Sequence, residues 1–257
     1  MTTAVRTAAT RSVPVAGPRK LAIAAGVLYL ITHVTSVPAA FLYGQVLSNP
    51  DYIVGAGPDA RVLWGGFLEV ICALAIVGTA VALFPVVRRH GEGAALGYVG
   101  LRTLEAGIIA VGVVPLLAVA TLRQQLAGTA GADTATLVTL GHALVAAHTW
   151  TVVLGPGLVC GVNTVVLASL LYRSGLVPRV IPVLGLIGGP LVFAYNTARL
   201  FGVSEQALSW AALGVVPIFA WEVLLALRLI ARGFNAAAIA AEPAGTEPRG
   251  QLAAHPA

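Results

Sequence analysis

The residues of this chain that carry chemistry are ionisable and polar side chains set inside long apolar stretches. If those stretches cross a membrane, an unpaired charge at a helix centre costs about 2.5–3.5 kcal/mol on insertion scales, so such residues indicate functional sites by default. Arg102 and Glu105 are three residues apart, so they share one face of a helix, together with Tyr98, and can pair there. We assign to one intramembrane polar cluster His33, Glu69, Arg102, Glu105, Asn163 and Glu222.

Two kinds of chemistry fit this cluster. It is either a buried structural network that fixes the register of the helices, or a site or pathway for a proton, an ion or a small polar solute. Glu69 and Glu222 have no partner within their own apolar stretches. Glu222 and Arg102 both lie about two turns from the ends of their stretches on the same predicted side, so a contact between them is geometrically available. His33 lies alone in mid-stretch, which favours a satisfied core histidine over a proton relay.

The composition identifies the elements that must position these side chains. Of the 257 residues 58% are hydrophobic and 10% are charged, with a mean hydropathy of +0.90. Soluble domains carry about a quarter charged residues, so an ordinary soluble globular domain is excluded. Apolar stretches of about 20 residues match the thickness of a bilayer. The sequence therefore predicts an all-α, polytopic membrane helical bundle.

Six spans are expected, and each is separated from the next by turn residues or polar residues. Their approximate ranges are 21–43, 62–87, 94–121, 152–172, 180–202 and 207–230. Residues 1–20 and 231–257 lack apolar periodicity and are expected to be disordered tails. The membrane domain accordingly covers residues 21–230.

The fourth span needs an extension or a break. Residues 136–172 would make a helix of roughly 55 Å, longer than one perpendicular crossing requires. The expected break is Gly155-Pro156-Gly157, and the placement of segment 136–151 is left open: it projects outward, lies on the membrane or re-enters it.

The basic residues set the expected orientation. With six spans and the N-terminus inside, 11 lysines and arginines fall on the inner side and three on the outer side. This bias predicts a multi-pass protein of the cell membrane with both termini in the cytoplasm. The formal net charge of +5 is scattered over loops and tails, so we expect no nucleic-acid partner. The expected partners are the lipid bilayer and a small-molecule or proton ligand.

The other candidate residues carry weaker signals. His142 and His148 are six residues apart, about 120° round a helix, which is unlike a metal pair, and Cys72 and Cys160 each lie in an apolar stretch. The sequence contains no nucleotide loop, dinucleotide fingerprint, nucleophile elbow or zinc-protease helix. We therefore assign no catalytic residue, no metal and no cofactor, and favour a protein that is not an enzyme.

Glycines four residues apart provide the packing signal. These pairs are Gly93 with Gly97, Gly157 with Gly161, and Gly185 with Gly189. Each leaves a groove for a neighbouring helix, which favours packing within one chain over a dedicated dimer face and leaves an oligomer open.

Several runs of the sequence resemble a bacterial membrane family known as domain of unknown function 4386. They are residues 21–51, 61–85 and 95–105, Leu154-Gly155-Pro156-Gly157 through Asn163-Thr164, and the run from Leu171 to Arg179. The resemblance covers about residues 20 to 230 and implies a multi-span membrane protein without an assigned activity, so it transfers no functional residue. The positions that match are Glu69, Arg102, Glu105, Gly155, Pro156, Gly157, Asn163, Arg173 and Pro178.

Three functional hypotheses follow from these residues. The first is transport, permeation or sensing of a small solute or proton through the polar cluster. The second is a lipid-modifying enzyme that uses His142 and His148 with Asp51 or Glu69 as acid, base or metal ligands. The third is a structural or partner-binding membrane subunit, which the small-residue grooves favour.

Overall fold

The computed structural model describes residues 17–55, 59–126, 133–203 and 211–240. In these ranges the chain is helical throughout its regular elements, which confirms the predicted all-α class. The elements are α1 Pro18–Ser48, η1 Tyr52–Val54, α2 Ala60–Val87, η2 Arg88–His90, α3 Glu92–Leu126, α4 Thr134–Val152, η3 Val153–Val159, α5 Cys160–Ser174, α6 Val180–Leu200, α7 Ala211–Arg232 and α8 Ala236–Ala240.

Six helical segments in the described part of the chain are long and apolar enough to cross a membrane. They are Pro18–Ser48, Ala60–His90, Glu92–Gln125, Thr134–Ser174, Val180–Leu200 and Gly214–Arg232. Large apolar side chains cover their outer faces: Phe41 is 80% exposed and Leu74 is 69% exposed. An apolar surface of this extent suits lipid rather than water. The chain is a multi-pass helical membrane protein.

The contacts between the six spans form a closed ring. They run from α1 to α2, α2 to α3, α3 to α4 and α5, α5 to α6, α6 to α7, and from α7 back to α1. A closed ring gives every span an inward face, so polar residues on different helices can meet at the centre.

The two ends of the ring differ in charge. One end, which we call the basic end, holds the start of α1, the end of α2 with η2, the α5–α6 turn and the end of α7. Its basic residues include Arg19, Arg88, Arg89, Arg173, Arg179 and Arg232. The opposite end, the far end, holds Arg61, Arg123 and Arg199.

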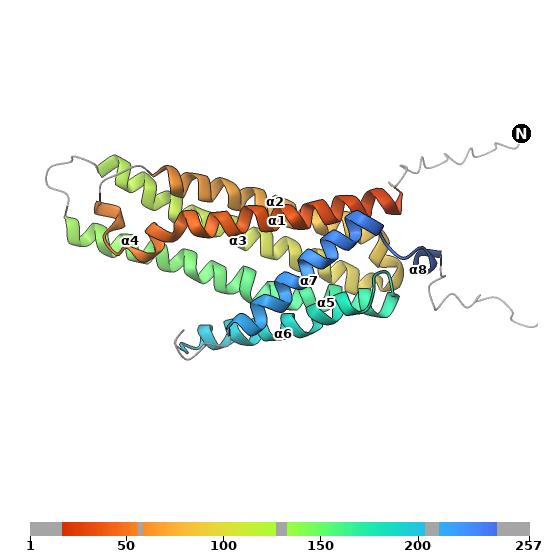
Figure 1. Cartoon of the computed structure of the whole chain (residues 1–257). Coiled ribbons are helices and arrows are strands. Elements are labelled where there is room, and N and C mark those ends of the chain that lie inside the picture. The colour runs from red at the N-terminus through yellow and green to blue at the C-terminus, as the bar shows by residue number, and fades with distance from the viewer. Residues whose placement is uncertain (1–16, 56–58, 127–132, 204–210, 241–257) are drawn as a thin grey trace, which may run out of the picture.

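The apolar core has separate parts along the bundle. Toward the basic end a large cluster joins side chains from α1, α2, α3, α5, α6 and α7, with Trp221 and Leu83 among its fully buried members. Toward the far end a smaller cluster joins α1, η1, α2 and α3, and side chains of α4 pack against it. Figure 1 shows α6 and α7 diverging from the other spans toward the far end.

Glycines allow the closest approaches between helices. A Cβ on Gly161 would lie 2.9 Å from the Gly189 carbonyl oxygen, and a Cβ on Gly189 would lie 2.8 Å from that of Gly161. These two predicted grooves therefore face each other within the chain. Gly93 and Gly97 differ, because a Cβ at either would meet nothing within 4 Å.

The helices extend into both predicted tails. α1 begins at Pro18, three residues before the predicted span, because proline fits the first turn of a helix. α7 continues to Arg232 and α8 follows, so residues 231–240 are largely helical rather than disordered. The guanidinium of Arg19 explains part of this: it donates to the carbonyls of Leu229 and Ile230, at 3.1 and 2.8 Å, and so caps the end of α7. Residues 1–16 and 241–257 of the predicted tails, and 207–210 of the predicted sixth span, lie outside the described residues.

The predicted break in the fourth span is a wide helical turn instead. Gly155-Pro156-Gly157 lies in η3, a π-helical segment from Val153 to Val159 that joins α4 to α5 without interruption. Pro156 has no N–H to donate and its ring crowds the preceding turn, and a wider turn accommodates both effects. The prediction of an extended helix is correct, since Thr134–Ser174 is continuous. Segment 136–151 packs against α3 and η1.

Candidate functional site

Arg102 is the centre of a buried polar cluster inside the ring. Its side chain is only 2% exposed. The Nη1 atom donates to Glu105 Oε2 at 3.1 Å, one turn along α3, as the spacing predicted. The Nε and Nη2 atoms donate to the Thr79 hydroxyl of α2 at 3.3 and 3.2 Å. The guanidinium therefore joins α2 to α3.

Glu105 connects the cluster to α5. Its Oε2 atom also accepts from Asn163 Nδ2 at 2.6 Å. The backbone of the fourth span lies close to α3 near this bond, since a Cβ on Gly155 would lie 3.0 Å from Ile108 and 3.5 Å from the Glu105 carbonyl oxygen. Glycine at this position lets the fourth span approach α3 closely.

His33 and Glu222 form the outer edge of the cluster, at the contact between α1 and α7. His33 Nε2 lies 3.5 Å from Glu222 Oε2, and Glu222 Oε1 lies 3.9 Å from Arg102 Nη1. The His33 and Glu222 side chains are 15% and 13% exposed, against 5% for Glu105. The expectation that His33 stands alone is wrong, because the ring closes α7 onto α1. The contact expected between Arg102 and Glu222 is present at ion-pair distance.

Two tyrosines line the same space. The hydroxyls of Tyr29 and Tyr98 lie 2.9 Å apart, and the Arg102 guanidinium carbon lies 5.3 Å from the centre of the Tyr29 ring. Tyr29 and Thr79 were missed by the sequence analysis. A signal existed for Tyr29, which is four residues before His33 just as Tyr98 is four residues before Arg102. We call the central cluster the set His33, Tyr29, Thr79, Tyr98, Arg102, Glu105, Asn163 and Glu222.

Glu69 belongs to a different group. Its Oε2 atom accepts from the Tyr43 hydroxyl at 3.1 Å. The Tyr43 ring packs edge-on against His148, with centroids 5.4 Å apart, and His148 Nδ1 lies 2.8 Å from the Gly112 carbonyl oxygen. The structure thus gives Glu69 a partner on α1, nearer the far end, rather than a place around Arg102.

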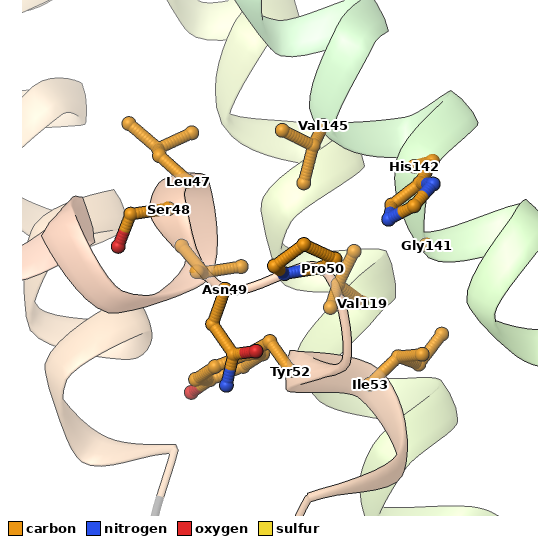
Figure 2. Close-up of a pocket in the computed structure, with 11 residues that line it drawn as sticks. Leu47, Ser48, Asn49, Pro50, Tyr52, Ile53, Val119, Gly141, His142 and Val145 are labelled. Atoms are coloured by element: carbon orange, nitrogen blue, oxygen red, sulfur yellow. The ribbon is translucent and has the colours of Figure 1, made fainter.

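Of the residues proposed for an enzyme, only His142 lines the pocket at the far end. A pocket of about 400 Å³ at the far end is lined by His142 together with Ser48, Asn49, Pro50 and Tyr52, and by apolar residues (Figure 2). Its lining includes neither His148, Asp51 nor Glu69. Among the residues that the structure describes, no group of three or more His, Cys, Asp or Glu is placed to hold a metal ion.

A second buried ion pair closes the far end of the bundle. Arg123 Nη1 donates to Asp59 Oδ1 at 2.8 Å, and its Nε donates to the Gly55 carbonyl at 3.0 Å. Tyr52 packs under the guanidinium and donates to Asp59 at 3.1 Å. Burial is the main reason that the pKa of Tyr52 is raised, and its hydrogen bond to Asp59 raises this pKa further. These contacts hold η1 against α3. They were not predicted, because Asp59 and Arg123 both lie outside the predicted spans.

The fold and the central cluster define a polytopic α-helical membrane protein with a charged, hydrogen-bonded centre. A family model described as a domain of unknown function, DUF4386, matches residues 24–233. The chain belongs to this family, as the resemblance of its motifs predicted. No curated protein and no solved structure matches the chain.

Proposed function

We propose that this protein binds and releases a proton at the His33–Glu222 pair and uses that event in transport across, or sensing at, the cell membrane. The orientation proposed with it places the basic end and both termini in the cytoplasm, because lysine and arginine accumulate on the inner side of membrane proteins.

The main support for this proposal is the tautomer of the His33 ring. Its Nδ1 atom lies 2.9 Å from the Tyr29 carbonyl oxygen and 3.3 Å from the Thr32 hydroxyl. The carbonyl can only accept, and the Thr32 hydroxyl already donates to that same carbonyl at 2.7 Å. Nδ1 therefore carries a hydrogen, since both of its neighbours are acceptors.

With hydrogen on Nδ1, the Nε2 atom of a neutral His33 carries no hydrogen. In a neutral imidazole with hydrogen on Nδ1, Nε2 is an acceptor, and it faces an oxygen of Glu222 at 3.5 Å. Two lone pairs facing each other repel when the carboxylate is ionised. One proton removes the repulsion, either as imidazolium beside carboxylate or as imidazole beside carboxylic acid.

The net charge of the central cluster also favours one bound proton on the His33–Glu222 pair. Arg102 and the Glu105 carboxylate balance each other, so the His33–Glu222 pair decides the net charge. With one proton on the pair the cluster is neutral, and without it the cluster carries one negative charge in an apolar surrounding. Other titratable groups that interact with Glu222 are Tyr29, Cys72, Tyr98 and Cys160.

The position of the pair suits a proton site. His33 lies at the midpoint of α1, and Glu222 lies at the middle of α7. Both side chains are less deeply buried than Arg102 and lie at the edge of the central cluster. Ionisable groups at this depth commonly serve proton relays.

Direct observation of the proton tests the proposal. The purified full-length protein in lipid nanodiscs would be titrated while histidine protonation is followed by ¹⁵N NMR and carboxylic acid by infrared difference spectroscopy. Wild type is expected to show either an imidazolium signal from His33 or a carboxylic acid band from Glu222. Finding neither signal at any pH where the protein stays folded overturns the proposal.

Glu222→Gln is the matched variant. Its amide supplies a hydrogen toward Nε2 without a titrating proton, so the fold is expected to persist while the titration step disappears. Glu69→Gln, also in the membrane but bonded to Tyr43, is the control and should keep the step.

Proton flux then separates transport from sensing. Wild type and Glu222→Gln would be reconstituted in liposomes containing a pH dye, under an imposed pH gradient and potassium diffusion potential. Faster dissipation in wild type supports transport, whereas proton binding without flux supports sensing.

A further inference from the structure

A second site lies at the basic end, away from the central cluster and independent of the proton proposal. A pocket of about 510 Å³, open to the surface, lies between the start of α1, the end of α2 with η2, and α8. Its apolar walls are Leu21, Pro85, Val86 and Ile239, and its polar lining comes from Arg89 and His90. The pocket thus combines apolar walls with the guanidinium of Arg89 and the imidazole of His90.

The neighbouring Arg19 and Arg88 make contacts outside this pocket, whereas Arg89 lines it. Arg19 donates to the final carbonyls of α7, and the Arg88 guanidinium lies 5.7 Å from the centre of the Phe84 ring. Arg89 is exposed and lines the pocket together with His90, which is half-buried. A guanidinium offers paired donors that match the oxygens of a phosphate group.

The start of α1 adds to the positive potential. Gly17 and Pro18 line the pocket, and the Gly17 cap provides no side-chain acceptor for the first turn. The N-terminus of this 31-residue helix is the positive end of its macrodipole. Anions are stabilised at such positions.

We propose that this pocket binds the phosphate-bearing headgroup of an anionic phospholipid. The position favours a lipid over a soluble anion: the pocket lies where α1 begins and α2 ends, both are membrane spans, and apolar side chains form its walls. Arg89 and the start of α1 hold the phosphate, while Leu21 and Ile239 contact the glycerol and the first methylene groups. Positive charge at this end complements the anionic surface of the inner leaflet.

Affinity for short-chain lipids tests the proposal. The full-length protein in neutral detergent would be titrated with dihexanoyl phosphatidylglycerol, with dihexanoyl phosphatidylcholine and with inorganic phosphate. Arg89→Gln is expected to weaken phosphatidylglycerol binding about fivefold, as for the loss of one basic group near a lipid surface. Arg173→Gln, at the same end but absent from the pocket lining, is the matched control and should bind as wild type does.

The lipid site predicts one pattern of affinities across these ligands and variants. Tighter binding of phosphatidylglycerol than of phosphatidylcholine, reduced by Arg89→Gln and by His90→Gln but not by Arg173→Gln, supports the site. Equal binding of the two lipids, or equal loss in Arg89→Gln and Arg173→Gln, overturns it. Inorganic phosphate that binds as tightly as phosphatidylglycerol would show a soluble-anion site and overturns the lipid assignment. Arg89 is exposed, so its substitution leaves the folded bundle intact for the measurement.

Discussion

Asn163 donates to the same oxygen of Glu105 that accepts from Arg102. The two bonds measure 2.6 and 3.1 Å and converge on Oε2 from α5 and from α3 itself. A carboxylate that accepts from a neutral amide and a guanidinium is held in one orientation, and α5 is fixed against α3 at that level. The bond between Asn163 and Glu105 therefore sets how the fourth span meets the centre of the ring.

Asn163→Asp should disrupt this contact more than Asn163→Ala. The aspartate would place a second carboxylate against Glu105, whereas alanine only removes one hydrogen bond to a charged group, at a cost of about 1.5–3 kcal/mol, and leaves the bond from Arg102 in place. Thermal unfolding in detergent should give the order wild type, Asn163→Ala, Asn163→Asp from highest to lowest Tm at neutral pH. An aspartate variant as stable as the alanine variant would contradict the convergence on Oε2.

Gly161→Ala should destabilise the bundle by about 1–3 kcal/mol, because the added methyl overpacks the α5–α6 contact. Its Cβ would lie 2.9 Å from the Gly189 carbonyl, which is backbone and cannot rotate away. Gly97→Ala is the control, since a Cβ there meets nothing within 4 Å and alanine favours the helix. Equal Tm values for the two variants would show that α5 and α6 do not depend on this approach.

The sequence predicted those parts of the structure that depend on one helix or on turn counting. The spans follow from apolar length, the Arg102–Glu105 bond from a spacing of three, and the Arg102–Glu222 contact from equal depth in two spans that run in opposite directions. Each of these needs only the period of a helix and the alternation of spans across a bilayer.

Contacts that depend on which spans are neighbours were not predictable in this way. His33 meets Glu222 because α7 returns to α1, and Glu69 meets Tyr43 because α1 and α2 present those faces to each other. Apolar periodicity says little about such neighbours when most faces of a membrane helix are apolar. The π-helical turn was also missed, because proline and glycine indicate a disturbance of the helix without saying whether it breaks or widens.

Asp133 should make the start of α4 sensitive to acid. Its carboxylate accepts from the Thr136 hydroxyl, and it caps the helix by accepting from the Ala135 N–H at 3.1 Å. The bond from Thr136 and then the bond from Ala135 lower the pKa of Asp133. Because the pKa is lower in the folded state, the stabilisation is present above the unfolded value and is lost as the pH falls through the folded value. The protection of the first-turn amides of α4 against hydrogen exchange, taken relative to their intrinsic rates, should therefore fall below about pH 3.9.

Asp133→Asn provides the comparison for that prediction. Asparagine also caps helices but does not titrate, so its exchange should lack this acid-dependent step. If wild type and Asp133→Asn respond to acid alike, another group causes the fraying.

Arg123 and Asp59 should behave as a coupled buried pair. Both are almost fully buried, so Arg123→Met leaves an uncompensated carboxylate beside Tyr52, with an expected loss of about 3–5 kcal/mol. Asp59→Asn combined with Arg123→Met removes both charges and should lose less than the two single variants added together. Unfolding free energies for the four proteins form a double-mutant cycle, and simple additivity would show that the pair does not hold η1 against α3.

Arg102 provides the test that separates a structural role of the central cluster from a functional one. Arg102→Met leaves Glu105 and Glu222 facing an apolar side chain, so the free energy of unfolding should fall by about 3–5 kcal/mol at neutral pH. Adding Glu105→Gln removes the charge that Arg102 balances and should recover part of this loss, because Asn163 and the new amide can still bond. In that double variant the His33–Glu222 pair remains in place, so the proton signal of the pair should persist while the stability is partly restored. If stability recovers and the proton signal disappears, Arg102 is required for proton binding itself; if both persist, Arg102 and Glu105 serve the fold and the His33–Glu222 pair alone holds the proton.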